Sequence, residues 1–214
     1  MKDILLAGIA GSGKGTQARA LEEMFGDKIQ YFEPGSILRA LSSNDNVVGD
    51  YAKKYTSAGR LLPDPFIKGV LNLVFASLED SSRLLVDGFP RMYGQKKMFD
   101  DAMKETGRDF IMFHLVIPKE EAIKRLQWRL ICPLCGSTYN VHLHGNIETC
   151  PLDNTHLQHR ADDQSMEAIQ HRFKSFYDDT TPIINEYKAE GKLIEIDGTL
   201  PIDEVTKAIV VHLE

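Results

Sequence analysis

The sequence lacks the features that mark membrane-embedded and disulfide-rich proteins. No uninterrupted apolar stretch approaches the roughly 20 residues that a bilayer-spanning helix needs. The first residues, Met1-Lys2-Asp3, run directly into an apolar segment and show no signal-peptide pattern. The 3 cysteines are too few for a disulfide framework. We therefore expect a cytoplasmic protein that does not bind membranes.

An excess of positive charge is also missing. The 214 residues contain 25 Lys and Arg against 31 Asp and Glu, which gives a net charge of −6. This balance argues against a general binder of nucleic acid. The chain shows no internal repeat, and its length suits one large domain or a core with insertions. Because no pattern indicates an obligate oligomer, we expect a monomer.

Short apolar segments alternate with longer helical patterns along the chain. The expected strands cover residues 4–7, 29–32, 83–86, 110–117 and 193–196. The expected helices cover residues 14–25, 35–43, 47–57, 64–78, 92–105, 119–130, 165–189 and 202–213. Apolar strands that alternate with helices are typical of a parallel sheet covered on both faces. The pattern therefore predicts an α/β fold with helices on both sides of a central parallel sheet.

A glycine-rich stretch follows the first strand. It reads Gly8-Ile9-Ala10-Gly11-Ser12-Gly13-Lys14-Gly15-Thr16. Strand, glycine loop and helix in this order are typical of a phosphate-binding loop (P-loop), in which backbone N–H groups surround a polyphosphate. Lys14 is expected to reach the outer phosphates and a hydroxyl to help hold Mg²⁺. That hydroxyl comes at Thr16, one place later than in the general P-loop pattern, because Gly15 follows the lysine.

A second motif ends the third expected strand. It reads Asp87-Gly88-Phe89-Pro90-Arg91, directly after an apolar run. The carboxyl ends of parallel strands line the ligand crevice of such sheets. We therefore expect Asp87 to organise the water shell of Mg²⁺ and Arg91 to hold phosphates.

The cysteines cluster in one short segment. Cys132-Pro133-Leu134-Cys135 and Cys150-Pro151-Leu152-Asp153 share a two-residue spacing. Paired knuckles of this kind are typical of a tetrahedral zinc site, and a carboxylate oxygen is a normal zinc ligand. A zinc ion with four protein ligands would be structural. A segment without metal is one alternative, and a histidine as fourth ligand is another. The four expected ligands are Cys132, Cys135, Cys150 and Asp153, and the competing histidines are His142, His144 and His156.

Four motifs of this sequence resemble those of the adenylate kinase family of nucleoside monophosphate kinases, in order and spacing. They are the loop ending in Lys14-Gly15-Thr16, the Asp87–Arg91 turn with Gln95 four residues later, the pair Cys132-Pro133-Leu134-Cys135-Gly136, and Arg160-Ala161-Asp162-Asp163. The resemblance covers essentially the whole chain. It implies reversible phosphoryl transfer from ATP to AMP, giving two ADP, with Mg²⁺ accompanying ATP and a structural Zn²⁺.

The family's architecture implies three parts. They are a P-loop core with three layers around a five-stranded parallel sheet (1–32, 63–127 and 164–214), a helical insertion that binds the monophosphate (33–62), and a zinc-bearing lid (128–163).

The family's functional positions map onto this sequence residue by residue. The resemblance implies catalytic roles for Lys14, Asp87, Arg91, Arg125, Arg129, Arg160 and Arg172. It implies that ATP contacts Gly11, Ser12, Gly13, Lys14, Gly15, Thr16, Arg129, Thr138, Tyr139 and Leu200. It implies that AMP contacts Pro34, Arg39, Arg60, Leu61, Leu62, Gly88, Phe89, Pro90, Arg91, Gln95, Arg160 and Arg172.

The acceptor side departs most from the family's pattern. Pro34 replaces a threonine that contacts the acceptor base, and Ser36 replaces an aspartate near the Mg²⁺ water network. A kinase for another nucleoside monophosphate is therefore the alternative function. A catalytically silent nucleotide-binding sensor of the same fold is a further alternative, although the complete set of arginines argues against it.

Three details of the lid and the following helix also stay open. Trp128 fills a usual glycine at the lid hinge, where an indole would stiffen the hinge or pack on the closed lid. One extra residue precedes Arg172, so His171 is the alternative for its role. Asp162 and Asp163 either cap the helix that follows or hold Arg160 and close the lid.

Overall fold

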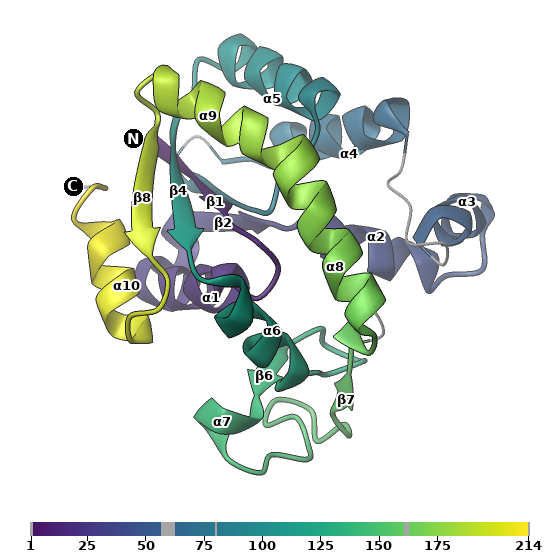
Figure 1. Cartoon of the computed structure of the whole chain (residues 1–214). Helices are drawn as coiled ribbons and strands as arrows, with labels where there is room; N and C mark the ends of the chain where they lie inside the picture. The colour runs from purple at the N-terminus through teal and green to yellow at the C-terminus, as the bar shows by residue number, and fades with distance from the viewer. Residues whose placement is uncertain (1, 57–62, 80, 161–162, 214) are drawn as a thin grey trace.

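A five-stranded parallel sheet forms the centre of the molecule (Figure 1). The computed structural model describes residues 2–56, 63–79, 81–160 and 163–213. The strand order is β2-β3-β1-β4-β8, and each neighbouring pair is parallel. The strands are β1 (Lys2–Ala7), β2 (Ile29–Phe32), β3 (Arg83–Asp87), β4 (Asp109–Val116) and β8 (Leu193–Asp197). This confirms the α/β fold and the five expected strands.

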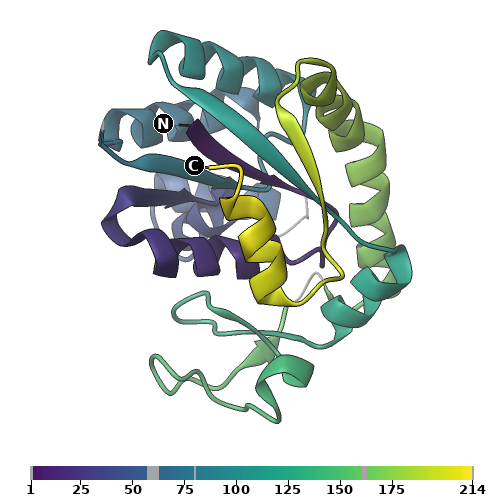
Figure 2. The same ribbon diagram turned by 90° about the vertical axis from the view of Figure 1, so that its left-hand side faces the viewer.

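Helices cover both faces of the sheet (Figure 2). One layer consists of α1 (Lys14–Phe25) and α10 (Ile202–Val210), and the other of α4 (Asp64–Ser77), α5 (Tyr93–Glu105) and α9 (Thr181–Ala189). Successive strand residues point to opposite faces. In β1, Ile4 and Leu6 therefore pack with Leu21 of α1, whereas Leu5 packs in a separate cluster with Phe99 of α5. Because helices cover both faces, the strands are apolar on both sides, which is why their apolar runs could be recognised in the sequence.

Two further segments join the core at one end of the sheet. The first holds α2 (Pro34–Ser42) and α3 (Val47–Thr56), and a 3-10 turn, Gly26–Lys28, precedes β2. The second follows α6 (Lys119–Gln127) and contains α7 (Val141–His144) with a small antiparallel sheet, β6-β5-β7. Its strands are β5 (Arg129–Ile131), β6 (Thr138–Asn140) and β7 (Gln158–His159). We call this second segment, residues 128–163, the lid.

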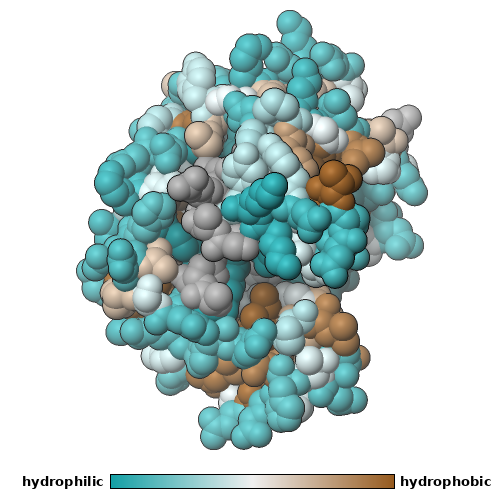
Figure 3. Space-filling view, turned by 90° about the vertical axis from the view of Figure 1, so that its right-hand side faces the viewer, coloured by the Kyte–Doolittle hydropathy of each residue, from teal (hydrophilic) through white to brown (hydrophobic). Residues whose placement is uncertain are grey.

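The lid corrects one expectation about the helices. The helix expected over 119–130 ends at Gln127, because Trp128 closes it and the next residues pair as β5. The sheet of the lid was not expected, because its strands have only two or three residues each and show no apolar run. Three buried residues, Cys132, Tyr139 and Cys150, form most of its small core. At the level of the lid, Figure 3 shows apolar surface, and exposed leucines there include Leu134.

The helix expected over 165–189 is interrupted. It consists of α8 (Met166–Ser175), a π-helical turn over Phe176–Thr180, and α9. Within the described ranges no helix is both long and apolar enough to cross a membrane.

Candidate active site

A cavity of about 760 Å³ lies beside the glycine loop and collects charged side chains from the core, the lid and the α2 segment. Six of the seven arginines singled out from the sequence line it, together with Lys14 and Asp87. These arginines are Arg39, Arg91, Arg125, Arg129, Arg160 and Arg172. A pocket with this much positive charge fits a ligand that carries several negative charges, such as a polyphosphate.

The glycine loop closes tightly onto its own backbone. Gly13, the residue before α1, has a φ of 97°, a conformation that L side chains rarely adopt. At Gly8 a Cβ would lie 2.5 Å from Ser12 Oγ and 2.7 Å from the Leu115 carbonyl oxygen. The buried Ser12 hydroxyl has no hydrogen-bond partner among the described residues. Such an orphaned hydroxyl beside a helix N-terminus fits a bound phosphate.

Lys14 lies folded against this loop. Its Nζ donates to the carbonyl oxygens of Gly8 (2.8 Å) and Ile9 (3.1 Å). Burial lowers the pKa of Lys14 to about 8, although the negative charge of Asp87 acts in the opposite direction. An ammonium group at such a site gains from a nearby anion, which favours its charged form.

Asp87 ends β3 and faces the loop from the neighbouring strand. The Tyr31 hydroxyl donates to Asp87 Oδ2 (3.2 Å). Burial raises the pKa of Asp87, although the positive charge of Lys14 acts in the opposite direction. A Cβ at Gly15 would lie 3.7 Å from Asp87 Oδ2, so the carboxylate is close to the first turn of α1. The Thr16 hydroxyl also lines the cavity, and these oxygen atoms fit the ligand preference of Mg²⁺ or its bound water.

Two lid-side arginines share one buried carboxylate. Arg129 donates to Asp163 through Nε (2.6 Å) and Nη2 (2.7 Å), and Arg172 donates to the same carboxylate through Nη1 (2.6 Å). The Asp163 side chain is 1% exposed. Arg172 lines the cavity, whereas His171 is exposed.

The expectation that Asp163 caps the following helix is wrong. The cap of α8 is Ser165, whose hydroxyl accepts from the backbone N–H of Ala168 (3.1 Å). Asp163 instead accepts from the two arginines. Asp162, the other candidate, lies outside the described residues.

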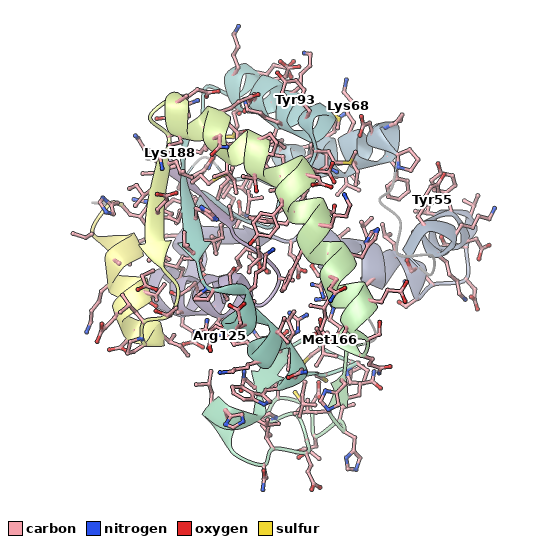
Figure 4. All side chains as sticks on the ribbon, viewed as in Figure 1. Tyr55, Lys68, Tyr93, Arg125, Met166 and Lys188 are labelled. Carbon is pink, nitrogen blue, oxygen red and sulfur yellow. The ribbon has the colours of Figure 1, made fainter. Side chains whose placement is uncertain are left out.

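Arg91 and Arg125 each donate to a backbone carbonyl oxygen of the core. Arg91 donates through Nε to the Gly88 carbonyl oxygen (2.6 Å). Arg125, labelled in Figure 4 on α6, donates through Nη1 to the Gly198 carbonyl oxygen (2.9 Å) and through Nε to Glu121 (2.8 Å). The positions of these guanidinium groups therefore depend on turns of the core as well as on their own helices.

Of the residues expected to contact the acceptor, the structure brings Arg39 to the cavity, together with Glu33 and Ser36. Glu33 was not expected from the sequence. Pro34 is the first residue of α2 and does not line the cavity. The Ser36 hydroxyl donates to the Glu33 carbonyl oxygen (2.8 Å). The other residues expected here, Arg60, Leu61 and Leu62, lie outside the described residues.

In the turn after β3, Arg91 lines the cavity, whereas the three residues before it do not. Gln95 is buried, and its Oε1 accepts from the Arg91 backbone N–H (2.9 Å). Phe89 packs in the core against Phe32 and Phe99. Gly88, Phe89, Pro90 and Gln95 are not among the residues that line the cavity.

The donor-side residues expected from the sequence lie along the same cavity. Thr138, Tyr139 and Leu200 line it, as do Gly11, Ser12, Gly13 and Gly15. Sequence reasoning missed Arg19, whose guanidinium carbon lies 6.0 Å from the centre of the Tyr139 ring. Arg19 lies on the helix that follows the glycine loop, and no motif marked it.

Trp128 also lines the cavity and lies at the junction of α6 and the lid. Its ring centre is 3.6 Å from that of His142. The Trp128 carbonyl oxygen accepts from the backbone N–H of Val141, which continues the β5–β6 pairing. Both contacts tie the hinge to the antiparallel hairpin.

The cysteine cluster of the lid has the geometry of a metal site. The donor atoms of Cys132, Cys135, Cys150 and Asp153 all lie within 4.8 Å of one another. Cys135 Sγ lies 3.6 Å from Cys150 Sγ, and Cys132 Sγ lies 3.2 Å from Asp153 Oδ2. Thiolates 2.3 Å from a tetrahedral zinc ion lie about 3.8 Å apart, so these four residues fit zinc.

The competing histidines are less well placed than Asp153. Among the described side chains, no histidine belongs to the cluster. The His142 ring lies against Trp128, and His156 is exposed. The side chain of His144 lies outside the described part of the chain.

Comparisons with known proteins agree with this site. The family model for adenylate kinase matches residues 6–192. The adenylate kinase of Dehalococcoides mccartyi is 32% identical over 212 residues, which are 98% of this chain and 97% of that protein. The adenylate kinase of Fusobacterium nucleatum is 31% identical over 208 residues (97% and 96%). That of Archaeoglobus fulgidus is 30% identical over 214 residues (99% and 98%). The chain, with its glycine loop and surrounding arginines, therefore belongs to the adenylate kinase family.

Proposed function

We propose that this chain catalyses the reversible, Mg²⁺-dependent transfer of the terminal phosphoryl group of ATP to AMP, which gives two ADP. The observation that carries the proposal is the single cavity that the glycine loop, Asp87 and six arginines line together. Phosphoryl transfer needs in-line positioning and positive charge around the transferred group more than it needs covalent chemistry. The positive charge gathered around one volume beside the glycine loop supports the proposal.

The residues divide into donor and acceptor sides in this proposal. The glycine loop and Lys14 bind the donor phosphates, with Thr138, Tyr139 and Leu200 near the donor nucleoside. Arg39 and Arg91 bind the acceptor phosphate, and the other four arginines neutralise charge on the transferred group. Mg²⁺, held by oxygen ligands among which we place Asp87 and Thr16, would neutralise donor phosphate oxygens.

We also propose the division into a P-loop core (1–32, 63–127 and 164–214), a monophosphate-binding insertion (33–62) and a lid (128–163). Transfer to a nucleotide requires exclusion of water, because water would otherwise accept the phosphoryl group. Both insertions border the cavity, which supports their closing over the substrates.

A structural Zn²⁺ in the lid is a further part of the proposal. The Cys₃Asp cluster supports it, because its donor atoms lie at distances that a tetrahedral ion requires. Free thiols held this close persist as metal ligands in a reducing compartment, which favours a cytoplasmic location. We propose a monomer, since no pattern in the sequence indicates an obligate oligomer.

Initial rates with ATP and each of AMP, GMP, CMP and UMP test the proposal. We expect AMP to be the preferred acceptor, with activity lost on removal of Mg²⁺. Lys14→Ala and Arg91→Ala should each lower kcat by orders of magnitude, because each removes a charge that faces the transferred phosphates. Preference for another monophosphate would favour the alternative suggested by Pro34. Nucleotide binding without turnover of any acceptor would favour a silent sensor.

A further inference from the structure

The carboxylate of Glu33 lies against the arginine that we assign to the acceptor phosphate. Arg39 Nη2 is 3.1 Å from Glu33 Oε1 and 3.3 Å from Oε2. Both residues line the cavity, and their side chains are 39% (Arg39) and 22% (Glu33) exposed. A negative group of the protein therefore contacts the Arg39 guanidinium, which we assign to the acceptor phosphate.

The start of α2 makes this contact possible. Glu33 precedes the helix, and its side chain does not cap it. A Cβ at Gly35 would lie 3.0 Å from Glu33 Oε1 and 3.0 Å from Arg39 Nη1. The glycine therefore leaves the space in which the two side chains meet. The Ser36 hydroxyl donates to the Glu33 carbonyl oxygen (2.8 Å) in the same turn.

Glu33 also acts on the groups around the transferred phosphoryl group. Burial raises the pKa of Asp87, and the negative charge of Glu33 raises it further. Burial lowers the pKa of Arg91, and Glu33 acts against that shift. The carboxylate is therefore close enough to contribute to the electrostatic potential of the acceptor side as a whole.

We propose that Glu33 competes with the acceptor phosphate for Arg39 and thereby sets the affinity for the nucleoside monophosphate. The inference rests on the proposed function, because it places the acceptor phosphate at Arg39. A phosphate dianion and a carboxylate that share one guanidinium nitrogen bring like charges together. The phosphate must displace Glu33, and this displacement weakens acceptor binding. Binding of the donor at the glycine loop does not require it.

The test replaces Glu33 by a neutral residue of the same size. We expect Glu33→Gln to lower the Kd for AMP about fivefold, as measured by calorimetry without ATP. This factor corresponds to about 1 kcal/mol, the contribution of an exposed ion pair. The Kd for ATP, measured in the same way, should change less than about twofold, because a charge that does not contact the ligand has only a small effect on its binding. Glu33→Ala is a second neutral variant with the same expected direction.

Two further variants separate this contact from a general effect of charge. In an Arg39→Ala background, Glu33→Gln should change the Kd for AMP by less than about twofold, because the shared partner is gone and only the longer-range effect of Glu33 on groups such as Arg91 is left. Glu22→Gln removes another carboxylate that lines the cavity, where Glu22 interacts with Arg19, and should leave AMP binding unchanged.

The outcomes distinguish this inference from the proposed function. An unchanged or larger Kd for AMP in both neutral variants would overturn the inference, and so would a fivefold effect that persists undiminished without Arg39. The proposed function would stand even then, provided that the unmodified protein converts ATP and AMP to ADP. Absence of AMP binding to the unmodified protein would overturn both.

Discussion

Replacement of Asp163 by asparagine tests how the lid-side arginines are held. The Asp163 side chain is 1% exposed and accepts three charge-assisted hydrogen bonds from Arg129 and Arg172. Loss of one partner of a buried ion pair costs about 3–5 kcal/mol. Because the two arginine side chains are 17% and 25% exposed, we expect the lower end of that range, about 3 kcal/mol.

The assay is thermal and urea unfolding with and without ATP. A loss of about 3 kcal/mol lowers the Tm of a chain of this size by roughly 6–12 °C. Saturating ATP should narrow the difference, because its phosphates bring negative charge to the same two guanidinium groups. Asp101→Asn is the matched control, since the Lys97–Asp101 pair is largely exposed (73% and 57%). That control should leave the Tm nearly unchanged, because exposed ion pairs contribute little to stability.

The reasoning would be refuted by an Asp163→Asn variant that loses less than about 1 kcal/mol, the value of an exposed pair. It would also be refuted if ATP left the difference in Tm unchanged. Either result would mean that Asp163 does not act as the counter-ion of two arginines that phosphate can replace.

Three other properties follow from the site. ATP binding should take up protons between about pH 8 and 10, because burial lowers the pKa of Lys14 to about 8 and bound phosphates favour its charged form. Calorimetry in buffers of different ionisation enthalpy measures this uptake, and Lys14→Arg should remove it. Cys135→Ser should lower the zinc content and the Tm of the purified protein, whereas His156→Ala should change neither; a mutant Cys135→Ser that kept both would contradict the zinc site. Trp128→Gly removes the ring contact with His142 (3.6 Å) and should speed amide exchange in β5 and β6 but not in β1, as measured by mass spectrometry.

The core of the fold was predictable because its signals are local. Strands such as β1, expected over 4–7, are continuous apolar runs, and the glycine loop is a contiguous motif. The Cys₃Asp cluster was predictable for the same reason, since its spacing repeats.

The rest of the site depends on contacts between residues that are distant in the sequence or unmarked by any motif. The lid sheet is built from strands of two or three residues around a few buried side chains, too short to show a period. Asp163 meets Arg129 across 34 residues, which no spacing rule predicts. Glu33 stands beside a motif, but its pairing with Arg39 depends on side-chain directions at the first turn of α2.

The fate of the terminal phosphoryl group of ATP tests the central claim most directly. With ATP labelled at that position, AMP and Mg²⁺, the account predicts that the label appears in ADP formed from AMP, with two ADP produced for each ATP consumed. Release of the label as inorganic phosphate, or its retention in ATP while nucleotides remain bound, would contradict it.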